Sequence, residues 1–148
     1  MNNEELKDKI GNTFLKLYQT KYITDIEDLC QGENKVLMYL YAADGEPVYP
    51  SDIAKALMIS KQRVTSVLNA MQKKGFCTLE HSTDDRRKIQ VKITHTGEKN
   101  LEKKQSVVQG YFDIFIEEIG MDKISEMCDG LEKAVNLLIE KEQNGGIQ

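Results

Sequence analysis

Two short helical segments separated by a two-residue turn constrain the fold of this chain most strongly. Pro50 suits the first position of a helix over residues 50–57, where its missing N–H costs nothing. Ser60 is a favourable N-cap for a second helix over residues 61–74, and Gly75 ends that helix after two lysines. Met58 and Ile59 form the turn between them. This spacing predicts a helix-turn-helix.

The hydrophobic period changes from helical to strand-like directly after Gly75. Residues 76–80 and 88–93 alternate between polar and apolar side chains, which is typical of strands. The segment between them, residues 81–87, is polar throughout. We therefore expect a β-hairpin with a long charged tip, in the position of a wing beside the helix-turn-helix.

The rest of the chain has helical periodicity. Asn3 is the expected N-cap of the first helix, and Thr94 is the expected N-cap of a long helix that ends near Gly120. The apolar stripes of the terminal helices are wider than one chain can cover, so they predict pairing with a second copy. Further helices are expected at residues 3–22, 32–43 and 122–142, with a helical turn within 25–30 and an extended segment at 46–49.

These elements predict a mainly α fold, a winged helix-turn-helix with a short β-hairpin flanked by N- and C-terminal dimerisation helices. We expect an N-terminal dimerisation helix and connector at residues 1–31, a DNA-binding domain at 32–94 and C-terminal dimerisation helices at 95–148. The net charge of −4 is unusual for a nucleic-acid binder. However, residues 55–104 hold 12 lysines and arginines against five acidic residues, whereas the remainder holds eight against 19. The local field attracts phosphate, and this segment is basic.

On a helical wheel, the helix over residues 61–74 has one apolar face and one polar face. Gln62, Ser66, Asn69 and Lys73 share the polar face, which contains no acidic residue. Glutamine and asparagine can pair with adenine edges, and the first turn of such a helix reaches the bases. An ordinary solvated helix is the alternative interpretation. The residues expected to contact DNA from this helix are Ser60, Lys61, Gln62, Arg63, Thr65, Ser66, Asn69 and Lys73.

The hairpin tip contributes a second set of candidates, Asp85, Arg86, Arg87 and Lys88. An arginine on a thin hairpin can enter the narrow, negative minor groove, and a neighbouring aspartate can hold its guanidinium. A solvated charge run that protects a sheet edge is the alternative.

Residues 48–97 resemble the MarR family of bacterial transcription regulators. The segments 50–57 and 59–61 are similar to that family's helix-turn-helix, and 85–94, followed by Gly97, is similar to its wing. The resemblance implies a homodimer that binds double-stranded DNA at a pseudo-palindromic site, probing the major groove with one helix and the minor groove with Arg86 or Arg87, steadied by Asp85. It also implies a small-molecule or oxidation signal. The family often has glycine where this chain has Met58, so we expect the turn to differ locally there.

A pocket for a small-molecule effector is implied where the dimerisation helices meet the DNA-reading lobe, and its candidate residues are Phe14, Tyr18, Tyr39 and Tyr41. Each of these side chains also fits an ordinary place in the core or at its rim. Redox-sensing members carry a cysteine in the first helix, which this chain lacks, since Cys30 follows it. Cys77 and Cys128 are the other thiols, and no CxxC pair is present.

No cofactor and no metal site are expected. Cys77 and His81 lie four residues apart on a predicted strand, about 13 Å, which is too far to share one ion. No nucleophile, phosphate-loop or zinc-hydrolase motif is present, so an enzyme is the weaker hypothesis. An acidic N-terminus and the lack of an apolar run of about 18 residues predict a cytoplasmic protein without a membrane-spanning helix. A winged-helix protein-interaction module and a thiol-based sensor remain alternatives.

Overall fold

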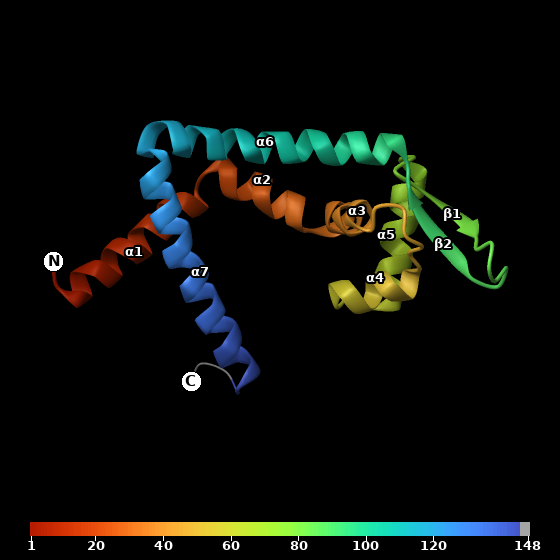
Figure 1. Ribbon diagram of the computed structural model, residues 1–148, viewed down its shortest axis with the longest axis horizontal. Helices are drawn as coiled ribbons and strands as arrows, with labels where there is room; N and C mark the ends of the chain where they lie inside the picture. Colours follow the sequence, from red (N-terminus) through yellow and green to blue (C-terminus); the bar gives the residue numbers. More distant parts are fainter. Residues whose placement is uncertain (146–148) are drawn as a thin grey trace. The chain divides into compact units, whose positions relative to one another are not determined.

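The computed structural model describes residues 1–145, and the chain forms two compact units, residues 1–108 and the residues from 109 onward. Figure 1 shows the order of the elements along the chain. The helices and strands of the described residues are α1 (Asn3–Tyr18), α2 (Lys21–Cys30), α3 (Gly32–Ala42), α4 (Pro50–Leu57), α5 (Lys61–Lys73), β1 (Cys77–His81), β2 (Ile89–Ile93), α6 (His95–Ile119) and α7 (Met121–Gln143).

The core of the first unit lies where α3, α4, α5 and the hairpin meet the start of α6. Helical spacing places the apolar residues of each helix on one face, and these faces are buried together. Leu101 and Val108 extend the core along α6. The most completely buried side chains are Val36, Leu37, Ile53, Val64, Met71 and Leu101.

The predicted hairpin is confirmed. β1 and β2 pair antiparallel, with Cys77 opposite Ile93 and His81 opposite Ile89. Val48 adds an isolated antiparallel bridge to Val91 on the other side of β2, within the segment expected to be extended. Because a two-stranded hairpin is marginally stable alone, this bridge and the core beneath it help to hold the wing against the helix-turn-helix.

The prediction of one helix over residues 3–22 was wrong. The chain breaks after Tyr18, and Thr20 adopts an extended conformation as the N-cap residue of α2. Both the backbone N–H and the hydroxyl of Thr20 donate to the carbonyl of Leu17, at 3.0 and 2.6 Å, which satisfies the end of α1. As a result, the expected turn at 25–30 is part of a complete helix.

The first N-cap is Asn2 rather than Asn3. The side chain of Asn2 accepts a hydrogen bond from the N–H of Glu5, and the Glu5 carboxylate accepts one from the N–H of Asn2. This reciprocal capping box requires a glutamate three residues after the cap, and only Asn2 has that spacing. The other predicted helices agree with the structure to within one or two residues, as helix ends usually do.

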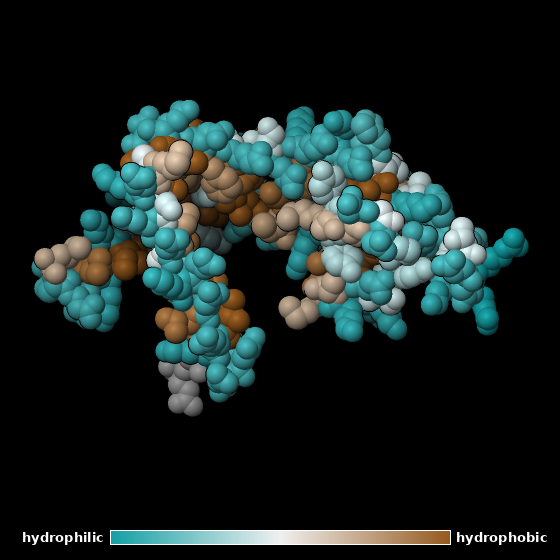
Figure 2. Space-filling model, viewed as in Figure 1, coloured by the Kyte–Doolittle hydropathy of each residue, from teal (hydrophilic) through white to brown (hydrophobic). Residues whose placement is uncertain are grey.

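Large apolar side chains remain exposed on α1 and throughout the second unit, and Figure 2 shows hydrophobic residues at the surface of α1 and α7. No residue of α1 or α7 is buried. No helix within residues 1–145 combines the length and the apolar character needed to cross a bilayer. The exposed side chains on the predicted stripes include Leu6, Ile10, Phe14, Phe112, Met127, Leu131, Val135 and Leu138.

Candidate nucleic-acid interface

The turn between α4 and α5 is fixed by three local features. Met58 ends α4 in the left-handed conformation, with φ 52° and ψ 45°. The N–H of Ile59 donates to the Ala54 carbonyl at 3.1 Å, which satisfies the last turn of α4. The Ser60 hydroxyl then accepts from the N–H of Arg63 at 3.1 Å, so α5 begins where predicted. The expected local difference at Met58 was wrong, because the methionine adopts the conformation that a glycine would adopt.

The two faces of α5 are cleanly separated. Val64, Val67, Leu68 and Met71 are buried in the core. All eight side chains proposed to contact DNA from this segment are exposed, and none of them is acidic. The outward face therefore presents amides, hydroxyls and cations to any partner that approaches α5.

Two of the eight have hydroxyls that already bond to the helix itself. Ser60 caps α5, and the Thr65 hydroxyl donates to the Lys61 carbonyl at 3.0 Å. The side-chain amides of Gln62 and Asn69 lie on the opposite side from the core and have the donor and acceptor pair that base edges require.

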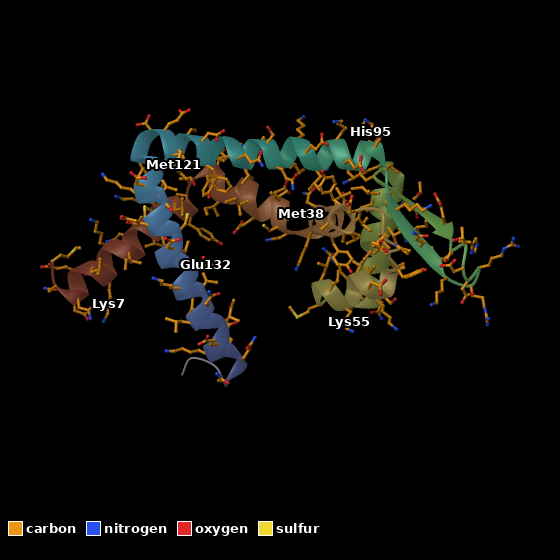
Figure 3. The ribbon with its side chains drawn as sticks, viewed as in Figure 1. Lys7, Met38, Lys55, His95, Met121 and Glu132 are labelled. Atoms are coloured by element: carbon orange, nitrogen blue, oxygen red, sulfur yellow. The ribbon has the colours of Figure 1, made fainter. Side chains whose placement is uncertain are left out.

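The wing tip is a closed loop. The N–H of Ser82 donates to the Lys88 carbonyl at 2.9 Å, and the N–H of Lys88 donates to the Asp85 carbonyl at 2.9 Å. Asp85 accepts from the N–H of Arg87 at 3.0 Å, and the same Oδ1 lies 3.5 Å from the Arg87 Nε. Of the two candidate arginines, Arg87 is therefore the one paired with Asp85. Its side chain is 95% exposed, and the side chains of the hairpin tip extend away from the core of the unit (Figure 3).

One joint connects α5, the wing and α6. The Thr94 hydroxyl donates to the carbonyl of Gly75 and accepts from the N–H of Gly97 at 3.1 Å, while the Thr94 N–H donates to the Phe76 carbonyl at 3.0 Å. A Cβ on Gly97 would lie 2.2 Å from the Phe76 oxygen. Because only glycine permits this approach, the start of α6 sits directly against the end of α5.

The charges of the wing strands are partly compensated. Lys92 Nζ lies 2.8 Å from a carboxylate oxygen of Glu80, and its hydrogen bond to that carboxylate lowers the pKa of Glu80. Lys88 lies with its Nζ 5.5 Å from the centroid of the Tyr49 ring. Asp85 pairs with Arg87, and the tip holds Arg86, Arg87 and Lys88 against Asp84 and Asp85, so it retains a net positive charge.

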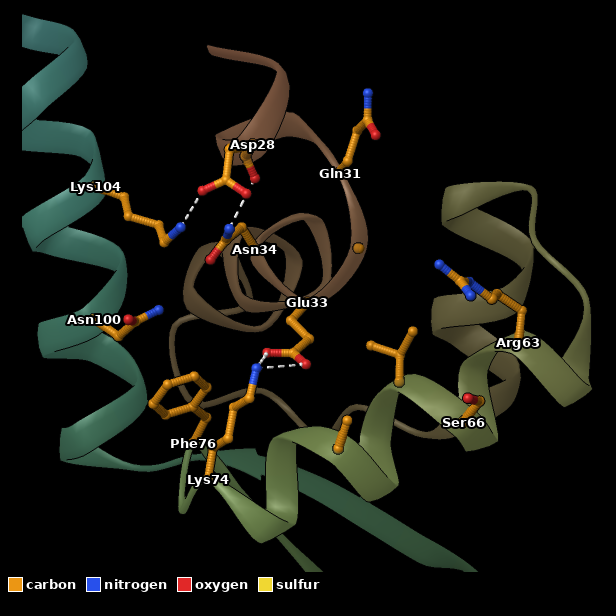
Figure 4. Close-up of a pocket in the computed structure, with 13 residues that line it drawn as sticks. Asp28, Gln31, Glu33, Asn34, Arg63, Ser66, Lys74, Phe76, Asn100 and Lys104 are labelled. Carbon is orange, nitrogen blue, oxygen red and sulfur yellow. Dashed lines mark hydrogen bonds and ion pairs between the residues drawn. The ribbon is translucent and has the colours of Figure 1, made fainter. Parts of the chain in front are cut away.

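A polar cavity of about 690 Å³ lies on another side of α5, between it and the residues of α2, α3 and α6. Figure 4 shows two ion pairs across it, between Lys74 and Glu33 at 2.8 Å and between Lys104 and Asp28. The Asn34 side chain is buried there and donates to the Asp28 carbonyl at 2.8 Å. Arg63 and Ser66, two of the proposed DNA contacts, form part of the wall.

The four predicted effector residues lie elsewhere. Phe14, Tyr18 and Tyr41 are exposed, and Tyr39 is half-buried against the core. Tyr18 donates a hydrogen bond to Glu27 at 3.0 Å, and this bond raises the pKa of its phenol. None of the four lines the cavity, so their role in binding an effector stays a prediction.

The thiols differ in environment. Cys30 and Cys128 are exposed, whereas Cys77, the first residue of β1, is buried in the core, and burial raises its pKa to about 11. A thiol with that pKa is almost entirely protonated at neutral pH, which makes Cys77 a poor nucleophile. Among the described residues, no group of three or more histidine, cysteine or acidic side chains is placed to hold a metal ion.

Residues 35–88, from α3 through the wing tip, match the sequence model of the MarR family. This winged-helix segment is similar to the MarR family. Two relatives from Bacillus subtilis are similar to part of the chain: the HTH-type transcriptional repressor YetL is 34% identical over 74 residues, and the HTH-type regulator YfiV is 35% identical over 72 residues. The matches span about half of this chain and 44% of each relative.

Solved structures extend the likeness in fold to nearly the whole chain. YusO from Bacillus subtilis matches with a TM-score of 0.76 at 19% identity, covering 90% of this chain and 99% of YusO. MepR, a transcription regulator of the Staphylococcus aureus multidrug efflux pump MepA, matches with a TM-score of 0.68 at 20% identity, covering 93% of this chain and 99% of MepR. At these identities the likeness shows the fold: a mainly α winged helix-turn-helix with helices on both sides of it in sequence.

Sequence reasoning did not find the contact between the start of α4 and the outer end of the wing strands. The Tyr49 hydroxyl lies 3.3 Å from the hydroxyl of Ser82, which is 33 residues later. The position of Tyr49 directly before the Pro50 helix start was visible in the sequence, but no local pattern connects it with Ser82. The polar cavity beside α5 was missed for the same reason, since its wall comes from four helices.

Proposed function

We propose that this protein is a sequence-specific, DNA-binding transcription regulator rather than an enzyme, acting in the cytoplasm. The observation that carries the proposal is the outward face of α5, which combines exposed amides with cations and lies on a winged helix similar to the MarR family. The polarity of that face disfavours a protein-interaction module, which would need an apolar face there. A solved structure of MepR is described as a complex with DNA, which supports this use of the fold.

The recognition mode has two parts. Gln62, in the first turn of α5, and Asn69, in its second half, read base edges in the major groove, while Arg87 reaches the adjacent minor groove from the wing. The remaining cations of α5 and the wing contact phosphates and set the register. Lys61, Arg63, Lys73, Arg86 and Lys88 are assigned to this second group.

Selection of bound sequences from random duplexes, followed by fluorescence anisotropy, tests the proposal. We expect a pseudo-palindromic site whose affinity falls steeply as salt rises, by about 10³-fold or more between 50 and 200 mM if six or more phosphates are contacted. Asn69→Ala is expected to weaken the selected site by about tenfold. Asn136→Ala, an exposed asparagine on α7, is the matched control. Equal affinity of wild type for selected and random duplexes would remove the claim of sequence specificity.

A homodimer is part of the proposal. The apolar faces left exposed on α1 and in the second unit are larger than scattered surface hydrophobes require, and a second copy provides an identical complementary face. Leu131→Glu places a charge in the centre of the α7 stripe and is expected to give a monomer by light scattering. Asn136→Glu adds the same charge outside that stripe and should remain dimeric. A monomeric wild type at micromolar concentration would contradict this part.

We further propose repression relieved by a small-molecule or stress signal. YetL is named a repressor, which supports the sign. A ligand in the polar cavity would contact Arg63 and Ser66 and so compete with DNA for α5. Transcription in vitro from a promoter overlapping the selected site tests the sign, since a repressor lowers product and an activator raises it. Release of DNA by a cavity ligand should be lost when Gln31, a cavity residue outside α5, is changed to alanine.

A further inference from the structure

Tyr49 lies between the helix-turn-helix and the wing. It is the N-cap residue of α4, and its N–H donates to the Asp52 carboxylate at 2.9 Å, so its backbone is fixed to the start of that helix. The preceding residue, Val48, accepts a hydrogen bond from the N–H of Val91 in β2 at 2.8 Å. The backbone on both sides of Tyr49 is therefore held, on one side by α4 and on the other by the wing.

The side chain of Tyr49 touches both ends of the wing-tip loop. Its hydroxyl lies 3.3 Å from Ser82 Oγ, and its ring lies 5.5 Å from the Nζ of Lys88. Ser82 and Lys88 are also bonded to each other through their backbones, and Ser82 Oγ accepts from the N–H of Asp84. Ser82 is only 3% exposed, so this hydroxyl contact is shielded from water.

This contact lies farther out along the wing than the Val48 bridge. Val91 pairs with Leu79, and Ser82 follows Leu79 by three residues, which corresponds to about 10 Å along a strand. The bridge at Val48 therefore fixes the middle of the hairpin, whereas Tyr49 fixes the point at which the tip loop begins. Arg87 lies inside that loop, one residue before Lys88.

We propose that Tyr49 is a positioning residue that sets the direction in which the wing presents Arg87 to DNA. The inference rests on the proposed function for the role of Arg87, but the anchoring itself is a property of the free protein. Without the phenol hydroxyl, the tip loop keeps its internal hydrogen bonds and loses its hydrogen bond to the helix-turn-helix, so that the ring beside Lys88 is the remaining Tyr49 contact. The loop then samples more orientations, and DNA binding must restrict them.

The test is a double-mutant cycle on the selected duplex with Tyr49→Phe, Arg87→Ala and the double variant. Tyr49→Phe is expected to weaken binding by about fivefold, the effect of one hydrogen bond of ordinary strength. In the Arg87→Ala background the same change is expected to have no further effect, because the group that Tyr49 positions is gone. Tyr22→Phe, which removes a phenol hydroxyl from a half-buried tyrosine on α2, is the matched control and should leave affinity unchanged.

A second measurement reports the anchor without DNA. Amide hydrogen exchange of residues 82–88 is expected to accelerate in Tyr49→Phe while exchange in α5 stays unchanged, and Ser82→Ala is expected to give the same result. Additive losses in the cycle, or unchanged exchange in both variants, would overturn the inference. If wild type binds no duplex, the proposed function fails, and the exchange result still decides whether Tyr49 anchors the wing.

Discussion

Met58 occupies the left-handed region at the end of α4 although it is not a glycine. The conformation is required by the turn, because it lets the N–H of Ile59 reach the Ala54 carbonyl. A left-handed backbone brings the Cβ of an L-residue too close to the following carbonyl oxygen. Met58→Gly removes this contact without altering the path of the chain.

The size of the effect follows from two opposing terms. Release of the left-handed strain is worth about 1–2 kcal/mol. The greater freedom of glycine in the unfolded chain offsets about 0.4–1 kcal/mol of that gain. The methionine side chain is 90% exposed, so its loss removes little burial. The expected net stabilisation is about 0.5–1 kcal/mol, which corresponds to a rise in melting temperature of roughly 2–3 °C for a chain of this length.

Urea unfolding followed by circular dichroism at one fixed protein concentration measures the change, because association contributes to apparent stability. Met58→Ala is the control that deletes the side chain and retains the strained backbone, and it should unfold at the wild-type midpoint. The reasoning fails if Met58→Ala is stabilised as much as Met58→Gly, since the side chain would then be responsible. It also fails if Met58→Gly is less stable than wild type.

Three further predictions concern stability and reactivity. Gly97→Ala places a Cβ 2.2 Å from the Phe76 oxygen and should lower the stability of the protein in urea unfolding by about 1–3 kcal/mol. The control Gly110→Ala, which has no neighbour within 4 Å, should leave the stability unchanged or raise it. Similar unfolding midpoints for the two variants would argue against the close approach at Gly97. Lys92 lowers the pKa of Glu80 below its ordinary 4.5, so this pair contributes stability above pH 4.5 that is lost as the pH falls through the lowered value. In thermal melts between pH 3 and 6, Glu80→Gln should therefore lose less stability on acidification than wild type. The same dependence of melting temperature on pH in both proteins would contradict this prediction. With a thiol reagent at pH 8, Cys77 should react only after unfolding in urea and Cys30 in the native protein, and rapid native labelling of Cys77 would refute its burial.

The winged helix was predictable because each of its elements carries a local signal. Pro50, Ser60 and Gly75 mark helix ends, and the alternation in β1 and β2 marks strands. The break between α1 and α2 was not predictable in this way. It depends on Thr20, a residue common in helices and outside them, with neither glycine nor proline beside it.

The N-cap of α1 was mispredicted for a different reason. Asn2 and Asn3 have the same side chain, and only the glutamate three residues after Asn2 decides between them. That signal is present in the sequence, but it is seen only when the cap and the third residue of the helix are considered together. The Tyr49 contact with Ser82 and the cavity beside α5 were not predictable for another reason. They join residues far apart in the chain and depend on packing that the sequence pattern does not specify.

The joint at Thr94 restricts how a signal can alter the proposed DNA-reading surface. Thr94 bonds to the end of α5 through the Gly75 and Phe76 carbonyls and to the start of α6 through Gly97, while β2 ends at the preceding residue. A displacement of α5 relative to the wing would break several of these bonds at once, so the two elements are expected to move together. In hydrogen exchange with a ligand that releases DNA, the Thr94 amide should stay protected. Loss of that protection would mean that the signal acts by separating α5 from the wing.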